Sequence, residues 1–153
     1  MRLAFVVAGM LWAATQAGAA TCSVTAVSLA FGNYNTFQGA HTDTTGNVAV
    51  TCSGKAGEVV AYSVALSAGR GVFSVRRMNT AAGFLLNYNI YTNAARTLVW
   101  GDGSSGTLVV NDAYTLAAPT TTRNYPVYGR AFSSQKAAAV GAYTDAIVVT
   151  LNF

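Results

Sequence analysis

The sequence predicts an all-β domain, built either as a sandwich or as a barrel. Short runs in which apolar and polar residues alternate recur along the chain, and clusters of Gly, Asn, Asp, Ser and Thr interrupt them about every 8–12 residues. These runs are rich in β-branched and aromatic residues, as is typical of strands. After the N-terminal segment, no stretch keeps apolar residues at helical spacing over several turns.

The N-terminal residues 1–19 predict a secretory signal peptide, with cleavage after residue 19 or 20. Arg2 precedes an apolar run over residues 3–14, and Ala17-Gly18-Ala19 fits the small-residue cleavage site. The run is shorter than the ~20 residues that a membrane-spanning helix needs. The remaining chain, residues 20–153, is therefore expected to be exported and to form one domain.

The expected strands follow one another as short segments between turns. In chain order they cover residues 22–31, 47–52, 59–67, 73–78, 84–91, 98–100, 107–110, 125–132 and 146–153. The first strand stops at Gly32-Asn33, and a polar loop through His41 leads to the second.

Three of these segments alternate most regularly, so one face of each is expected in the core. The faces consist of Val60, Tyr62, Val64 and Leu66; of Leu86, Tyr88 and Ile90; and of Ile147, Val149, Leu151 and Phe153. The last segment would be an aggregation hazard as an open sheet edge, so an earlier strand, a neighbouring subunit or a chaperone must cover it. Its pattern, ending in phenylalanine, also fits the closing strand of an outer-membrane barrel.

Two cysteines, Cys22 and Cys52, predict a disulfide, because an even pair in an exported protein is usually oxidised. A metal or redox pair is the alternative, but there is no C-x-x-C motif and the one histidine, His41, lies in a polar loop. No metal and no cofactor are expected.

Composition argues against nucleic-acid binding and against catalysis. Removal of Arg2 lowers the formal net charge from +4 to +3, and the other basic residues are scattered rather than gathered in a stripe. Residues 101–106 match G-x-G-x-x-G, but strand-forming residues follow where a dinucleotide site needs a helix. The acidic residues are spread singly, and no serine lies in a nucleophile-elbow context. We expect a structural, extracellular protein and not an enzyme.

Several segments, taken in order along the chain, resemble the domain of spore coat protein U. They are residues 22–24, 29–34, 46–52, 77–79, 86–91, 100–103, 141–145 and 148–153. This family includes the pilins of archaic (Csu-type) chaperone–usher fimbriae.

The resemblance implies an incomplete immunoglobulin-like sandwich that lacks its last strand. A periplasmic chaperone, and later a strand of another pilin or coat subunit delivered at the outer-membrane usher, would fill the gap by β-augmentation. The donor-strand groove would lie between the first and last strands, and its expected lining is Val24, Val27, Leu29, Ile147, Val149, Leu151 and Phe153. The family's disulfide maps onto Cys22 and Cys52.

The expected function is that of a secreted structural subunit of a surface fibre or coat. After cleavage only one or two residues would precede Cys22, so the subunit is expected to accept a strand without donating one. Two other functions stay open. One is an adhesive module whose loops carry Tyr34, Phe37, Tyr91 or Trp100, and the other is a small outer-membrane β-barrel.

Overall fold

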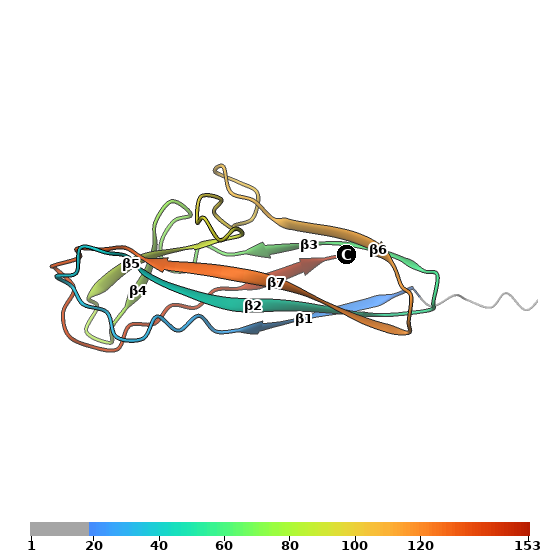
Figure 1. The fold of residues 1–153 in the computed structure, drawn as a ribbon, viewed down its shortest axis with the longest axis horizontal. Helices are drawn as coiled ribbons and strands as arrows, with labels where there is room; N and C mark the ends of the chain where they lie inside the picture. The colour runs from blue at the N-terminus through green and yellow to red at the C-terminus, as the bar shows by residue number, and fades with distance from the viewer. Residues whose placement is uncertain (1–18) are drawn as a thin grey trace, which may run out of the picture.

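Residues 19–153, which the computed structural model describes, form two antiparallel sheets packed face to face (Figure 1). The large sheet has the strand order β1 (Thr21–Val27), β2 (Thr42–Ser53), β7 (Thr120–Ala131), β5 (Leu85–Tyr91) and β4 (Arg76–Asn79). The small sheet has the order β6 (Val110–Thr115), β3 (Val59–Leu66) and β8 (Val149–Asn152). The prediction of an all-β sandwich is confirmed. The predicted signal peptide lies outside the described residues, except for its last position.

The regular alternation of β3 and β5 places one face of each strand between the sheets. The faces predicted for these strands are buried, with exposed fractions of 5% or less for Val60, Tyr62, Val64, Leu66, Leu86, Tyr88 and Ile90. Trp100 is fully buried beside them, and its indole nitrogen donates a hydrogen bond to the Val64 carbonyl at 2.9 Å. Removal of this apolar surface from water is the main force that holds the two sheets together.

The strand boundaries differ from the prediction where polar residues pair with a distant strand. β2 begins at Thr42, within the expected loop, because Thr42 to Gly46 pair with Ala131 to Val127 of β7. The strand expected at 107–110 is instead β6 at Val110–Thr115. Thr107 belongs to the preceding turn, where its hydroxyl bonds the Ser104 carbonyl at 2.7 Å. The segment expected at 98–100 forms isolated bridges rather than a strand.

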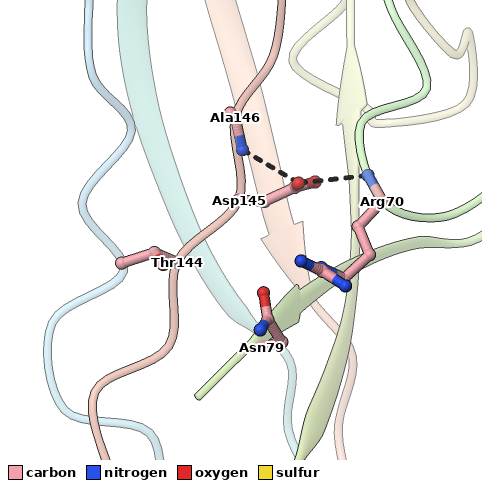
Figure 2. Close-up of a pocket in the computed structure, with 5 residues that line it drawn as sticks. All are labelled: Arg70, Asn79, Thr144, Asp145 and Ala146. Carbon is pink, nitrogen blue, oxygen red and sulfur yellow. Dashed lines mark hydrogen bonds between the residues drawn. The ribbon is translucent and has the colours of Figure 1, made fainter. Parts of the chain in front are cut away.

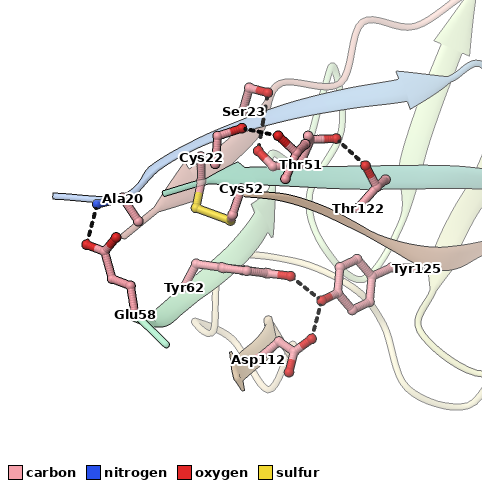
Figure 3. Close-up of a disulfide and its surroundings, with 12 residues drawn as sticks. Ala20, Cys22, Ser23, Thr51, Cys52, Glu58, Tyr62, Asp112, Thr122 and Tyr125 are labelled. Atoms are coloured by element: carbon pink, nitrogen blue, oxygen red, sulfur yellow. Dashed lines mark hydrogen bonds between the residues drawn. A yellow bond between two sulfur atoms is a disulfide. The ribbon is translucent and has the colours of Figure 1, made fainter. Parts of the chain in front are cut away.

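A disulfide and a group of side-chain hydrogen bonds join strands at the end of the sandwich where β1 begins (Figure 3). The predicted disulfide between Cys22 and Cys52 is confirmed, and it joins β1 to β2 at directly opposed positions. The hydroxyls of Tyr62 in β3 and Tyr125 in β7 lie 2.6 Å apart, and Tyr125 donates to the Asp112 carboxylate in β6. The hydrogen bonds of Tyr125 connect the small sheet to the large one. No helix of the described residues is long and apolar enough to cross a membrane.

Candidate functional site

A groove of about 370 Å³ opens between the chain that continues β1 and the chain that leads into β8. One wall is formed by residues 26–29 with Phe31, and the other by residues 143–145 with Ile147 and Val149. The floor belongs to the core and consists of Val48, Leu66, Met78, Tyr88, Ile90 and Val127. The lining is therefore mainly apolar, although the groove is open to solvent.

Two glycines on adjacent strands allow the first wall to lie close to the large sheet. A Cβ atom at Gly46 of β2 would come within 3.0 Å of the Leu29 side chain, and one at Gly129 of β7 within 3.0 Å of the Phe31 ring. Leu29 and Phe31 consequently pack directly on the sheet, and Phe31 meets Tyr88 edge to face with ring centroids 5.9 Å apart. The chain after β1 is thereby fixed as a wall of the groove.

The second wall changes from one sheet to the other. Thr144 forms a two-way backbone bridge with Asn79 of β4, at 2.9 and 3.0 Å, whereas β8 pairs with β3 of the small sheet. Ser67 holds the chain between these points, because its N–H donates to the Val148 carbonyl and its hydroxyl accepts the Val148 N–H. The Ser67 carbonyl is itself held by the fully buried guanidinium of Arg76.

Both edges of the opening have unpaired main-chain groups. Ser67 and Val148 are hydrogen-bonded to each other, and the next pair along the ladder is Leu66 with Val149. Because hydrogen-bonded and non-hydrogen-bonded pairs alternate in an antiparallel ladder, Val149 and Leu151 turn their N–H and C=O groups away from β3. The Cα atoms of Cys22 and Cys52 lie 4.0 Å apart, a spacing typical of a non-hydrogen-bonded pair. Cys22 and, by alternation, Val24 therefore turn their main-chain groups away from β2. Within residues 19–153, no ladder joins β1 to β8.

A carboxylate lies at the polar end of the groove, where the groove adjoins a shallow surface cavity (Figure 2). Asp145 accepts hydrogen bonds from the main-chain N–H groups of Arg70 and Ala146, at 3.1 and 2.9 Å, and from the Tyr88 hydroxyl at 2.7 Å. Burial first, and then the bond to Asp145, raises the pKa of the Tyr88 phenol far above its usual value of 10.0. Tyr88 is thus a permanent donor to this carboxylate at physiological pH.

The structure places four of the seven predicted groove residues in the lining: Val27, Leu29, Ile147 and Val149. Val24 and Leu151 are partly buried against the core, further along the same strands. Phe153 follows the end of β8 and is 67% exposed. These three residues lie outside the lining of the cavity, and their contact with a donor strand stays a prediction.

The sequence interpretation missed several residues that the groove contains. Phe31 was placed at the end of the first strand, Tyr143 was given no role in the site, and Asp145 was treated as an isolated acid. The alternation of residues 147–151, extended by one step toward the N-terminus, reaches Asp145 and was the available signal. Among the described residues, no three His, Cys, Asp or Glu side chains cluster as metal ligands would.

The family of this chain follows from a match over most of its length. Residues 9–150 match the family model of the Spore Coat Protein U domain. The chain belongs to this family. No curated protein is similar enough in sequence to count as a relative of this Spore Coat Protein U domain.

The fold of this domain is also similar to a solved structure. That structure is the crystal structure of the CsuC–CsuE chaperone–tip adhesion subunit pre-assembly complex from archaic chaperone–usher Csu pili of Acinetobacter baumannii. The TM-score is 0.60 at 21% sequence identity, and the match covers 88% of this chain and 40% of that chain. The present chain therefore spans less than half of the length of the chain in that structure, and at this identity the similarity concerns the fold.

Proposed function

We propose that this chain is a structural subunit of a surface fibre or coat of the chaperone–usher type, exported through the periplasm to the cell surface. Its groove would receive an extended donor strand, first from a periplasmic chaperone and then from a neighbouring subunit delivered at an outer-membrane usher. The observation that carries this proposal is the pair of unpaired edges, β1 and β8, on either side of an apolar groove. The family and the similar fold of a pilus subunit support it.

A donor strand would meet both needs of this opening. Its main chain would pair with the free N–H and C=O groups of Val149 and Leu151, and its alternate side chains would cover the apolar floor. In places the Cα atoms of β1 and β8 lie within 8 Å of each other. An inserted strand paired on both sides needs two strand spacings, about 9.6 Å. Insertion therefore has to move β1 away from β8.

Coexpression with a cognate archaic chaperone in the periplasm tests this function. We expect degradation of the chain alone and a stable one-to-one complex in size-exclusion chromatography when the chaperone is present. A soluble, protease-resistant monomer without the chaperone would contradict the proposal, because the sandwich would then close by itself.

A matched pair of variants locates the binding site. Val27 lines the groove and is 66% exposed, whereas Val140 is fully exposed in a loop and does not line it. We expect Val27→Lys to abolish the chaperone complex, because a charge enters the apolar groove, and Val140→Lys to leave it intact. Equal complex formation by both variants would place the chaperone elsewhere.

An adhesive role of the loops is the second candidate. Of the four aromatic residues considered, Trp100 and Tyr91 are buried, and the hydroxyl of Tyr34 donates to the Phe132 carbonyl, whereas Phe37 is 77% exposed. If Phe37 contacts a surface, Phe37→Ser will reduce cell or bead adhesion while the chaperone complex still forms. Unchanged adhesion would mean that Phe37 does not mediate adhesion, and the structural role would then be the one candidate left.

A further inference from the structure

Asp145 occupies the groove-facing row of the second wall. Asp145, Ile147, Val149 and Leu151 alternate along the chain and are all partly buried, while the residues between them are exposed. Within the groove lining, Asp145 is the one acidic or basic residue. The row that a donor strand would contact thus consists of a carboxylate followed by apolar side chains at every second position.

The carboxylate of Asp145 is held in place by hydrogen bonds, and the described residues form no ion pair with it. Its three hydrogen-bond donors are two main-chain N–H groups and the Tyr88 phenol, all uncharged. A carboxylate offers about four acceptor positions, so one is left for a further donor. No salt bridge to Asp145 is formed within residues 19–153.

The side chains of two arginines near Asp145 are directed toward other groups, although the charge of Arg76 attracts the carboxylate through space. Arg76 is fully buried and uses its guanidinium on the carbonyls of Ser67 and Trp100 and on the Asn89 side chain. In Figure 2, the guanidinium of Arg70 is turned toward Asn79, and its main-chain N–H, not its side chain, contacts the carboxylate.

We infer that the groove selects an extended segment whose inward side chains are apolar except for one Lys or Arg, placed opposite Asp145. This inference rests on the proposed function. Inward side chains of a strand recur every two residues, so the cationic residue and the apolar ones are spaced i, i+2 and i+4, in one chain direction or the other. The cationic group would use the remaining acceptor position of Asp145. The chain is basic overall, with a formal net charge of +4, so its general field disfavours such a ligand. A preference for a cation therefore has to come from a local group.

Synthetic donor peptides test this selectivity on the oxidised mature chain, which is purified as the chaperone complex and refolded without the chaperone in the absence of proteases. Each peptide has apolar residues at its inward positions and Lys, Gln or Glu at the end position, and each is made in both chain directions. Fluorescence anisotropy gives the affinities at low and high salt. We expect the Lys peptide to bind roughly 3–10-fold more tightly than the Gln peptide, with Glu the weakest, as for a partly exposed charge pair. Salt should reduce the preference for Lys.

Two variants assign the effect to one side chain. Asp145→Asn keeps hydrogen-bond acceptance but removes the charge, and we expect it to bind the Lys and Gln peptides equally. Asp102→Asn is the matched control, because Asp102 lies in an exposed turn outside the groove lining, and it should keep the wild-type ratio. If Asp145→Asn does not fold, the peptide series and its salt dependence on the wild-type chain decide the question.

The outcomes separate this inference from the proposed function. Failure of every alternating peptide to bind would overturn the donor-strand groove itself. Binding that is insensitive to the end residue, or a Lys preference that persists in Asp145→Asn, would overturn the selectivity while leaving the groove intact.

Discussion

Removal of the disulfide tests how firmly β1 is attached to the rest of the large sheet. β1 is an edge strand that pairs with β2 alone, and the disulfide between Cys22 and Cys52 joins the two strands near the start of β1 (Figure 3). The Cys52 side chain is fully buried. The perturbation is the double variant Cys22→Ala, Cys52→Ala, which deletes the link with little change of volume.

The loop closed by this disulfide sets the size of the expected effect. The two cysteines are 30 positions apart in the sequence. In the chain-entropy treatment, a loop of this length stabilises the folded state by about 3.6 kcal/mol at 25 °C. We therefore expect the free energy of unfolding to fall by about 3–4 kcal/mol, which is a large part of the stability of a domain of this size.

Urea denaturation of the chain, followed by tryptophan fluorescence, measures this loss for the double variant and for the reduced wild-type chain. Both should lose a similar free energy with an unchanged m-value, because the contacts of the folded state are preserved. The groove lies at the other end of β1, so donor-peptide affinity under native conditions should persist. A loss below about 1 kcal/mol would refute the reasoning, since the tether would then not restrict the unfolded chain as supposed.

Three further perturbations have defined outcomes. Burial raises the pKa of Tyr88, so its phenol stays protonated in the fold but ionises near pH 10 in the unfolded chain. The contribution of Tyr88 to stability is complete below pH 10 and falls above it by up to about 1.4 kcal/mol per pH unit, and burial of Tyr125 adds to the slope in the same direction. Thermal melts from pH 8 to 11.5 should show this slope, and Tyr88→Phe should reduce it. Gly69→Ala and Gly83→Ala both force alanine into a left-handed conformation, which costs about 1–2 kcal/mol. Only at Gly69 would the new Cβ clash with the Asp145 carboxylate in the groove wall, so only this variant should also weaken donor-peptide binding. Trp100→Phe removes the donor to a buried carbonyl of β3 and leaves a cavity, so we expect a loss of roughly 2–4 kcal/mol. Urea titration followed by circular dichroism measures it, since the variant of the mature chain has no tryptophan left, and a loss under about 1 kcal/mol would contradict the assigned role.

Local alternation was sufficient to predict the core faces of the central strands. β3 and β5 are buried on the predicted side because every second side chain of a strand points to the same face. The apolar side chains of each strand share one face, and that face packs between the sheets. The disulfide followed from export and an even cysteine count. Neither inference required knowledge of which strands are neighbours.

Pairing between distant segments accounts for what the sequence did not reveal. Thr42 to Gly46 are polar and become strand because β7, more than 80 positions away, pairs with them. The role of Asp145 depends on Tyr88, which is 57 positions away. Alternation identified the inward row of the last strand but not the point at which the sheets part, so it did not show which residues of that row line the cavity.

The groove exists because two segments of the chain leave their ladders on the same side of the sandwich. The chain after β1 separates from β2 and packs over Gly46, while the chain before β8 leaves its bridge to β4 at Thr144 and joins β3 at Val149. Between these points both walls are held by side-chain contacts and single bonds, such as those of Ser67 to Val148, rather than by a continuous ladder. Main-chain groups at the adjoining edges are therefore left for another strand, and the same break in pairing exposes the apolar floor. Recognition by main-chain pairing and recognition by side-chain burial thus share a single origin in the topology, so a ligand that satisfies one of them is brought into register for the other.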